Sequence, residues 1–194
     1  MTTDAAAPPR VLAVCTANIS RSPAVERLLR HRLGADVEVG SAGVMALVGE
    51  PIDPPVAAFL TARGVSPDGF AARQVTPSLL RDADLVLTLT REHRASVLSL
   101  LPAGVRRTFT LLEFSRLVGS LDLTGAAGPT EPDGPGDRLR RLVPLAAAQR
   151  PFAPRVAGAD DDVPDPFGRG REAYARSLAL IEGATARLLA VLAG

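Results

Sequence analysis

One short segment carries residues whose types and spacing could do phosphate chemistry. Cys15 and Arg21 lie six residues apart, and the segment between them joins the apolar run 11–14 to Ser22-Pro23, a typical helix start. Backbone N–H groups at a helix N-terminus and the Arg21 guanidinium would favour a thiolate over a thiol, and the same groups bind a phosphate dianion. An Arg side chain suits this role because its planar fork can engage two phosphate oxygens. The pattern therefore predicts a phosphate-cradling loop from Cys15 to Ser22, with Cys15 as a nucleophile.

A second candidate for chemistry is the run Asp165-Pro166-Phe167-Gly168, which precedes the last predicted helix. Thiolate attack on a phosphate ester expels an oxyanion that needs a proton. A carboxylic acid on a loop can supply that proton, and its carboxylate can then activate water. Phe167 would form an apolar wall against an aromatic ring, and Ile19 and Leu47 offer further apolar surface. For Leu47, a place at the pocket rim and a role as loop cover both remain open.

Apolar runs and helical patterns alternate along the chain. The runs 11–14 and 85–89 are nearly continuous apolar segments, which is typical of strands buried on both faces. Ser22 at the N-cap, Pro23 at the first helical position and Gly34 past the end frame the first helix. The alternation predicts an α/β fold with a parallel sheet and a ligand site at the carboxyl ends of its strands. The predicted strands are 11–14, 36–40, 85–89 and 107–112, and the predicted helices are 24–33, 54–63, 91–101, 137–149 and a last one through the core residues Tyr174 and Leu178.

The domain organisation predicted from the sequence is simple. Residues 1–9 are expected to be a flexible tail, and residues 10–194 a single domain. The segment from about 119 to 158 contains a Gly- and Pro-rich stretch and a helix that Pro144 should kink or restart. It reads as an insertion lying over or beside the site.

The composition argues against several classes of partner and location for this protein. A net charge of +1 argues against a nucleic-acid or membrane-surface partner. The sequence has no run of apolar residues long enough for a transmembrane helix, and the first residues lack the pattern of a secretion signal. A single cysteine cannot form a disulfide framework within the chain, so a reducing, cytoplasmic location is expected.

These motifs together resemble the low-molecular-weight protein tyrosine phosphatases. The residues that match are Val14 to Pro23, Ser41-Ala42-Gly43, Ala83 to Val86 leading on to His93, and Asp165-Pro166-Phe167. The resemblance implies a three-layer αβα fold with a four-stranded parallel sheet and no metal or other cofactor. It implies Cys15 as nucleophile, Arg21 as phosphate clamp and Asp165 as general acid and then base. It also implies that Asn18 holds the loop backbone with support from Ser41, and that Thr16, Ala17, Asn18, Ile19, Ser20 and Ser22 form the phosphate site.

Three departures from the family pattern bear on the substrate and on redox behaviour. Ser20 stands where many members carry a second Cys, and the insertion is longer than a minimal member needs. Residues 44–49 lack the aromatic wall of eukaryotic members. This loop resembles instead the bacterial branch that reverses autophosphorylation of tyrosine kinases controlling polysaccharide export. The predicted partner is therefore a phosphotyrosine-containing protein, such as a bacterial tyrosine kinase.

Two alternative functions remain open beside this hypothesis, and several polar residues are expected to have only a structural or solvent-exposed role. An arsenate reductase using an external small thiol fits the same fold, and a non-catalytic phosphopeptide-binding module would use the same loop. His93 and His31 lie in predicted helices with no catalytic pattern around them, so a structural role is expected for both. Residues 160–162 are all Asp and are expected to be a solvated loop, since they lack the ligand spacing of a calcium site.

Overall fold

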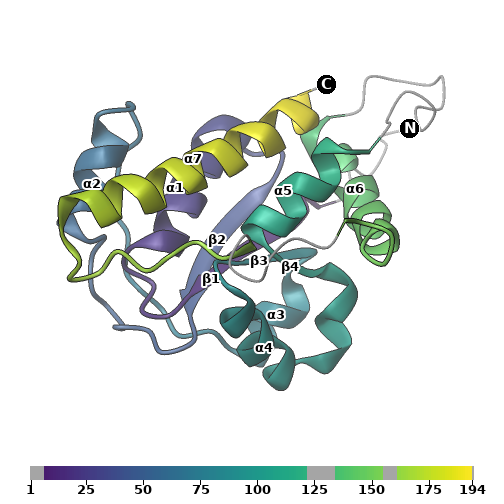
Figure 1. The fold of residues 1–194 in the computed structure, drawn as a ribbon, viewed down its shortest axis with the longest axis horizontal. Coiled ribbons are helices and arrows are strands. Elements are labelled where there is room, and N and C mark those ends of the chain that lie inside the picture. The colour runs from purple at the N-terminus through teal and green to yellow at the C-terminus, as the bar shows by residue number, and fades with distance from the viewer. Residues whose placement is uncertain (1–6, 122–133, 155–160, 194) are drawn as a thin grey trace.

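A four-stranded parallel sheet forms the centre of the molecule (Figure 1). The computed structural model describes residues 7–121, 134–154 and 161–193. The sheet order is β2-β1-β3-β4, and Cys15 at the end of β1 is in register with Gly43 of β2. Its strands are β1 (Arg10–Cys15), β2 (Glu38–Gly43), β3 (Leu85–Thr88) and β4 (Thr108–Thr110). All three strand pairs are parallel, so the carboxyl ends of the strands share one edge of the fold.

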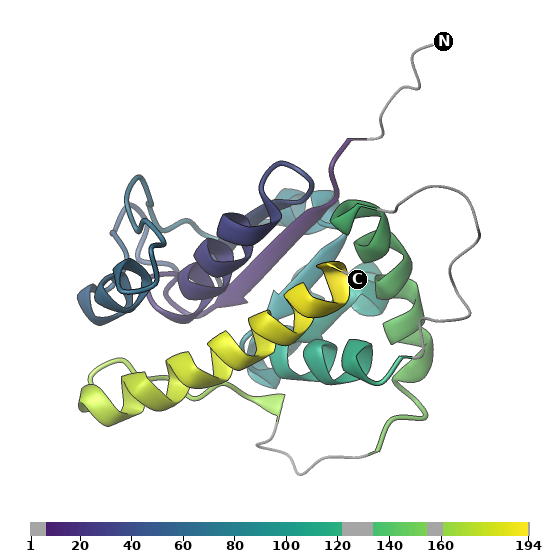
Figure 2. The same cartoon turned by 90° about the horizontal axis from the view of Figure 1, so that it is seen from above.

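Helices cover both faces of the sheet and produce three layers (Figures 1 and 2). Along β1 the side chains alternate: Val11 and Ala13 join the core on one face, while Leu12 and Val14 join that on the other. Helix α7 packs against both α1 and α5 on the first face. The first face carries α1 (Arg21–Leu33), α5 (Leu111–Gly119) and α7 (Gly170–Ala193), and the second carries α3 (Pro77–Asp82) and α4 (Arg91–Leu100). The predicted three-layer α/β fold is therefore confirmed.

The remaining helices lie around this frame. They are α2 (Pro54–Thr61), a 3-10 helix η1 (Pro102–Arg107) and α6 (Pro135–Gln149). Leu178 is buried in the core as predicted, and Tyr174 is partly buried there while its hydroxyl donates to the Asp53 carboxylate. Within the three described ranges, no helix combines the length and the apolarity that crossing a bilayer requires.

Several element boundaries differ from the sequence prediction: β2, predicted over 36–40, runs from Glu38 to Gly43, and two further differences have a clear physical cause. Helix α1 begins at Arg21 with Ser20 in the cap position, so the predicted N-cap role of Ser22 is wrong and its hydroxyl points elsewhere. The predicted strand 107–112 is also wrong beyond Thr110, because Leu111 opens α5. There the Thr110 side chain accepts from the Glu113 N–H and the Glu113 carboxylate accepts from the Thr110 N–H. This capping box ends the strand and starts the helix.

Helix α6, which forms most of the described part of the predicted insertion, lies away from the loop 15–22. Gly136 near its start packs against Pro9, just before β1. Arg150 just past its end donates to the Thr108 carbonyl, at the start of β4. The helix therefore crosses the amino ends of the strands, opposite the edge where β1 ends at Cys15 (Figure 2). The prediction that the insertion lies over or beside the site is wrong for this helix, and residues 122–133 and 155–160 lie outside the described residues.

Candidate active site

Cys15 and the start of α1 enclose a tight loop at the carboxyl end of β1. Cys15 is buried at 2% exposure, and the Ser22 hydroxyl lies 3.0 Å from its Sγ. Because Ser22 sits in the first turn of α1, its hydroxyl contacts the sulfur at the helix end whose backbone N–H groups can bind an anion. The local sequence thus places the sulfur, a hydroxyl donor and a helix N-terminus around one point.

Asn18 shapes the loop from inside. It has φ of 56°, a left-handed conformation that Asn tolerates better than most residues. Its side-chain Nδ2 donates to Ser22 Oγ at 3.0 Å and to Ser41 Oγ at 2.8 Å, while Oδ1 accepts from the Arg73 backbone N–H at 2.9 Å. Asn18 is fully buried, so it holds the loop and does not line the cavity.

The hydrogen-bond network continues to Glu26, a residue that sequence reasoning missed. Ser41 Oγ donates to Glu26 Oε2 at 2.6 Å, and Glu26 is 6% exposed on the buried side of α1. A nearly buried carboxylate is costly unless it is paired, and here it also accepts from Arg30 Nη1 at 3.4 Å. A charged residue at a buried helical position one turn after Ser22 is the signal that could have pointed to it.

The segment after β2 is hydrogen-bonded to the loop 15–22, called the catalytic loop below after its proposed role. The N–H groups of Val44, Met45 and Leu47 donate to the carbonyls of Cys15, Thr16 and Ala17 in that order. A Cβ on Gly43 would lie 2.3 Å from the Thr16 carbonyl oxygen, so only glycine allows this approach. The close backbone contact is what brings Leu47 to the rim of the site.

Arg21 and Asp165 form an ion pair at the mouth of the loop. Arg21 Nη2 lies 2.9 Å from Asp165 Oδ2, and Nη1 donates to the Val163 carbonyl at 3.1 Å. The Arg21 side chain is only 5% exposed, whereas that of Asp165 is 45% exposed. The guanidinium is therefore fixed, while the carboxylate can exchange with solvent or substrate.

Asp161 and Asp162 hold the chain that leads into Asp165. Asp161 pairs with Arg116 on α5 at 3.2 Å, and Asp162 accepts from the Arg91 N–H at the start of α4 at 2.7 Å. These contacts correct the expectation of a solvated acidic loop, because they anchor the segment at two helices. Asp160 lies outside the described residues.

His93 reaches the same loop from α4. Its Nε2 lies 2.8 Å from Thr16 Oγ1, which also accepts from Arg21 Nη2 at 3.5 Å. Burial lowers the pKa of His93 to about 4, and the Arg21 cation adds to this effect against the smaller opposing influence of Asp165 and Asp162. The imidazole is therefore neutral at ordinary pH. The sequence suggested no link between His93 and the loop, whereas His31 is exposed in the last turn of α1.

A cavity of about 180 Å³ opens above Cys15. Its lining combines polar loop residues with apolar side chains, of which Leu47 is 48% and Phe167 59% exposed. The lining residues are Cys15, Thr16, Ala17, Ile19, Ser20, Arg21, Leu47, Asp165 and Phe167. Of the predicted site residues, only Asn18, Ser22 and Ser41 lie behind this surface, where they support it. In the described part of the chain, no group of three or more His, Cys, Asp and Glu side chains is placed to hold a metal ion.

Comparison with known proteins decides the family. The profile of the family described as low molecular weight phosphotyrosine protein phosphatase matches residues 10–125. A low molecular weight protein-tyrosine-phosphatase of Streptomyces coelicolor is 35% identical over 187 residues, covering 93% of this chain and 92% of that protein. The chain belongs to this family.

One further sequence relative and one solved structure are also similar to this chain. Etp of Escherichia coli K12, named a low molecular weight protein-tyrosine-phosphatase, is 47% identical over 92 residues, and the aligned part spans 47% of this chain and 62% of Etp. The solved structure of the YwlE arginine phosphatase from Geobacillus stearothermophilus superposes with a TM-score of 0.66 at 26% identity, covering 94% of this chain and 92% of that one. Cys15 and Arg21 lie inside the family match, and Asp165 lies inside the long Streptomyces alignment.

Proposed function

We propose that this protein hydrolyses phosphotyrosine through a phosphocysteine intermediate. The observation that carries the proposal is the convergence of Cys15 Sγ, the buried Arg21 guanidinium and the Asp165 carboxylate on one cavity. Membership of the phosphatase family supports this reaction over arsenate reduction and over phosphopeptide binding without turnover. Binding alone would need neither the nucleophile nor the proton donor.

The reaction takes two steps. Cys15 Sγ attacks phosphorus, the S–P bond forms as the P–O bond to the tyrosine ring breaks, and Asp165 in its acid form gives its proton to the leaving oxygen. In the second step the Asp165 carboxylate takes a proton from water, whose oxygen attacks phosphorus and expels the thiolate. Arg21 and the loop N–H groups hold the phosphoryl oxygens throughout, where negative charge develops. Ser22, 3.0 Å from Sγ, stabilises the thiolate that leaves.

The cavity wall supports an aromatic substrate. Ile19, Leu47 and Phe167 offer apolar surface around a polar floor, and Phe167 directly follows the Asp165-Pro166 pair. An aromatic ring would pack on these side chains while its phosphate reaches the loop. The substrate in this proposal is a phosphotyrosine-containing protein, such as a bacterial tyrosine kinase. A reduced Cys15 thiol requires a reducing compartment, which supports a cytoplasmic location.

The deciding experiment compares turnover of peptides that carry different phosphorylated residues. Phosphotyrosine should be hydrolysed fastest, ahead of phosphoserine, phosphothreonine and phosphoarginine, the last included because one structural relative is an arginine phosphatase. Activity should persist with chelator present, since Arg21 and the loop supply the positive charge. Cys15→Ser should abolish turnover, because a neutral hydroxyl is a far weaker nucleophile than a thiolate and Asp165 must hold its proton for the leaving oxygen in the same step.

Three outcomes would contradict the proposal. Comparable rates on phosphoserine would reject the aromatic preference. Faster turnover of phosphoarginine would assign the other substrate class. Retained activity in Cys15→Ser, with no phosphoenzyme trapped from the unaltered protein by rapid acid quench, would reject the covalent mechanism.

A further inference from the structure

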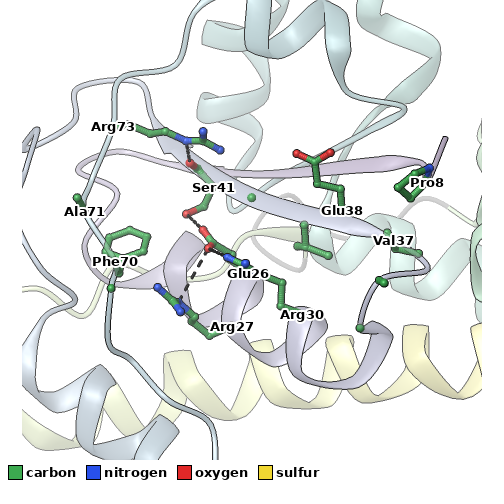
Figure 3. Close-up of a pocket in the computed structure, with 15 residues that line it drawn as sticks. Pro8, Glu26, Arg27, Arg30, Val37, Glu38, Ser41, Phe70, Ala71 and Arg73 are labelled. Carbon is green, nitrogen blue, oxygen red and sulfur yellow. Dashed lines mark hydrogen bonds and ion pairs between the residues drawn. The ribbon is translucent and has the colours of Figure 1, made fainter.

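A second and larger cavity, of about 490 Å³, lies beside α1 and β2 (Figure 3). It is bounded by α1, by the edge strand β2 and by the segment 69–73. Its volume lies in the range of small-molecule sites. Three arginines line it, namely Arg27 and Arg30 from α1 and Arg73 from the opposite segment. None of these arginines takes part in the reaction described above.

The acidic side chains of this cavity are already engaged. Glu38 pairs with Arg10 at 2.8 Å, and Glu26 accepts from Ser41 and Arg30. The three arginines of the lining exceed its two glutamates by one. The cavity therefore carries a net positive charge that an anionic ligand could neutralise.

Two of the arginines that line the cavity have donor groups without a hydrogen-bond partner among the described residues. Arg27 Nε is buried without a hydrogen-bond partner among the described residues, and its nearest carboxylate oxygen, Glu26 Oε1, is 3.9 Å away. Arg73 uses its Nε to donate to the Ser41 carbonyl at 2.8 Å, and its terminal Nη groups have no hydrogen bond to the described part of the chain. Figure 3 shows Arg27 and Arg73 on opposite sides of the Glu26–Ser41 contact. A buried unpaired donor such as Arg27 Nε is uncommon, whereas Arg73 is exposed and its Nη groups stay accessible to an acceptor.

Both walls of the cavity are hydrogen-bonded to the catalytic loop. On one side, Glu26 holds Ser41, which accepts from Asn18. On the other side, the Arg73 backbone N–H donates to Asn18 Oδ1 at 2.9 Å. Asn18, the left-handed residue of the loop, is therefore hydrogen-bonded to both walls of the cavity, through Ser41 on one side and Arg73 on the other.

We propose that this cavity binds a small phosphorylated metabolite through Arg27, Arg30 and Arg73, and that its occupancy tightens the catalytic loop. Guanidinium forks match the oxygens of a phosphate group. A ligand that bridges Arg73 and α1 fixes the segment 69–73 against β2, and with it the contact between Arg73 and Asn18. Binding at the two sites is then mutually favourable. The site itself is independent of the reaction, whereas its effect on turnover rests on the proposed function.

The test for the site is a residue-resolved NMR titration of the full-length Cys15→Ser protein. The probes are glycerol 3-phosphate and inorganic phosphate. Amide signals of Gly40 and Ala71 report the cavity, and those of Ala17 and Ile19 report the catalytic loop. Both groups of signals should shift and saturate, with separate affinities. A tighter cavity affinity for the ester identifies a metabolite, and equal affinities identify phosphate itself as the ligand.

The double substitution Arg27→Gln/Arg30→Gln should weaken cavity binding at least about tenfold and leave the Ala17 shift intact. Arg32→Gln is the matched control, since Arg32 is exposed on the same helix and does not line the cavity. An unchanged melting temperature of the double variant shows that it folds. Absent Gly40 and Ala71 shifts at millimolar probe, or shifts that the double substitution does not weaken, would overturn the site. These results do not depend on turnover, so they stay distinct from a failure of the proposed reaction.

Coupling between the sites is measured in the unaltered protein. Benzylphosphonate bound at Cys15 should tighten glycerol 3-phosphate binding in the cavity, and by linkage the reverse effect must have the same factor. A change of at least about twofold supports the coupling. An identical cavity affinity with and without benzylphosphonate would overturn it.

Discussion

The Asp165 carboxylate and the Arg21 guanidinium are ion-paired, with Oδ2 2.9 Å from Nη2. The pair joins the group proposed to donate a proton to the group proposed to bind phosphate. Because Asp165 is half-exposed, the pair adds little to stability. A phosphate entering the loop would take over the fork of Arg21 and release Asp165 toward the leaving oxygen. The ion pair therefore describes a resting state that substrate binding exchanges.

Asp165→Asn should slow phosphoenzyme formation in proportion to how much the leaving group needs a proton. The loss should be largest for phosphotyrosine, within the ~10²–10⁴-fold range of general acid catalysis. It should be smaller for nitrophenyl phosphate, whose leaving group departs without much protonation. Burst kinetics on both substrates measure the difference.

The matched control for this substitution is Asp137→Asn, which makes the same chemical change at an exposed carboxylate paired with Arg140 on α6, outside the cavity. Its effect should not depend on the leaving group. Equal losses across leaving groups for Asp165→Asn would mean that Asp165 is structural and that the acid lies elsewhere.

Substitutions at Asn18 should separate its backbone role from its side-chain role. Asn18→Gly removes the hydrogen bonds of the side-chain amide with Ser22, Ser41 and the Arg73 backbone, but glycine accommodates φ of 56°. Asn18→Ala removes the same bonds and adds strain in the left-handed region, about 1 kcal/mol. Both variants should lose activity, with the free energy of unfolding lowest for Asn18→Ala. Urea unfolding measures it, and equal stabilities would show that the backbone conformation is not constrained.

His93 should make the protein less stable as the pH falls. Its pKa of about 4 in the folded protein lies below the ordinary 6.5, mainly because of burial, so the unfolded chain binds more protons between these values. Stability is therefore highest above pH 6.5 and falls as pH drops toward 4, by at most about 3 kcal/mol. Between pH 7 and pH 5, the unaltered protein should lose about 2 kcal/mol more than His93→Gln does. Urea unfolding at both pH values checks this, and parallel losses would contradict it.

The catalytic loop was predictable because its signals are local. An apolar strand, Cys15, Arg21 and a Ser-Pro helix start follow one another within the span 11–23, and no distant contact is needed to recognise them. The helix α5 was missed although Thr110 and Glu113 form a capping box, since the apolar residues around them also suit a strand. The misplaced cap has a similar cause: Ser20 and Ser22 both precede apolar helical residues, and only three-dimensional contacts show that Ser22 serves Cys15.

The contacts around the loop could not be predicted, because they join residues that are far apart in the sequence. His93 meets Thr16 across 77 positions of the sequence, and Arg73 meets Asn18 across 55. Each contact depends on the order β2-β1-β3-β4, which no local pattern specifies. Glu26 differs, since its burial follows from its place on α1, but its pairing with Ser41 again needs the fold.

Oxidation gives a further test of the site, because Cys15 is the only cysteine in the chain. An accessible thiolate reacts with peroxide to a sulfenic acid. Family members with a second loop cysteine can trap that species as a disulfide, which reductant reverses. Here Ser20 stands at that position. It lines the same cavity as Cys15, and its hydroxyl is buried without a hydrogen-bond partner among the described residues.

The sulfenic acid of Cys15 therefore has no internal thiol to meet, and it must find an external thiol, form a sulfenamide or oxidise further to the irreversible sulfinic acid. Peroxide inactivation without small thiols should become largely irreversible, whereas excess thiol during exposure should protect the enzyme as a mixed disulfide. Ser20→Cys should restore the recovery of activity by reductant. The substitution should be tolerated, because the Ser20 hydroxyl makes no hydrogen bond to the described residues that would be lost. The measurement is activity regained with dithiothreitol after a timed peroxide pulse, with intact mass to identify the adduct and Ser20→Ala as control. Full recovery of the unaltered protein after prolonged thiol-free exposure would show that Ser20 does not limit rescue.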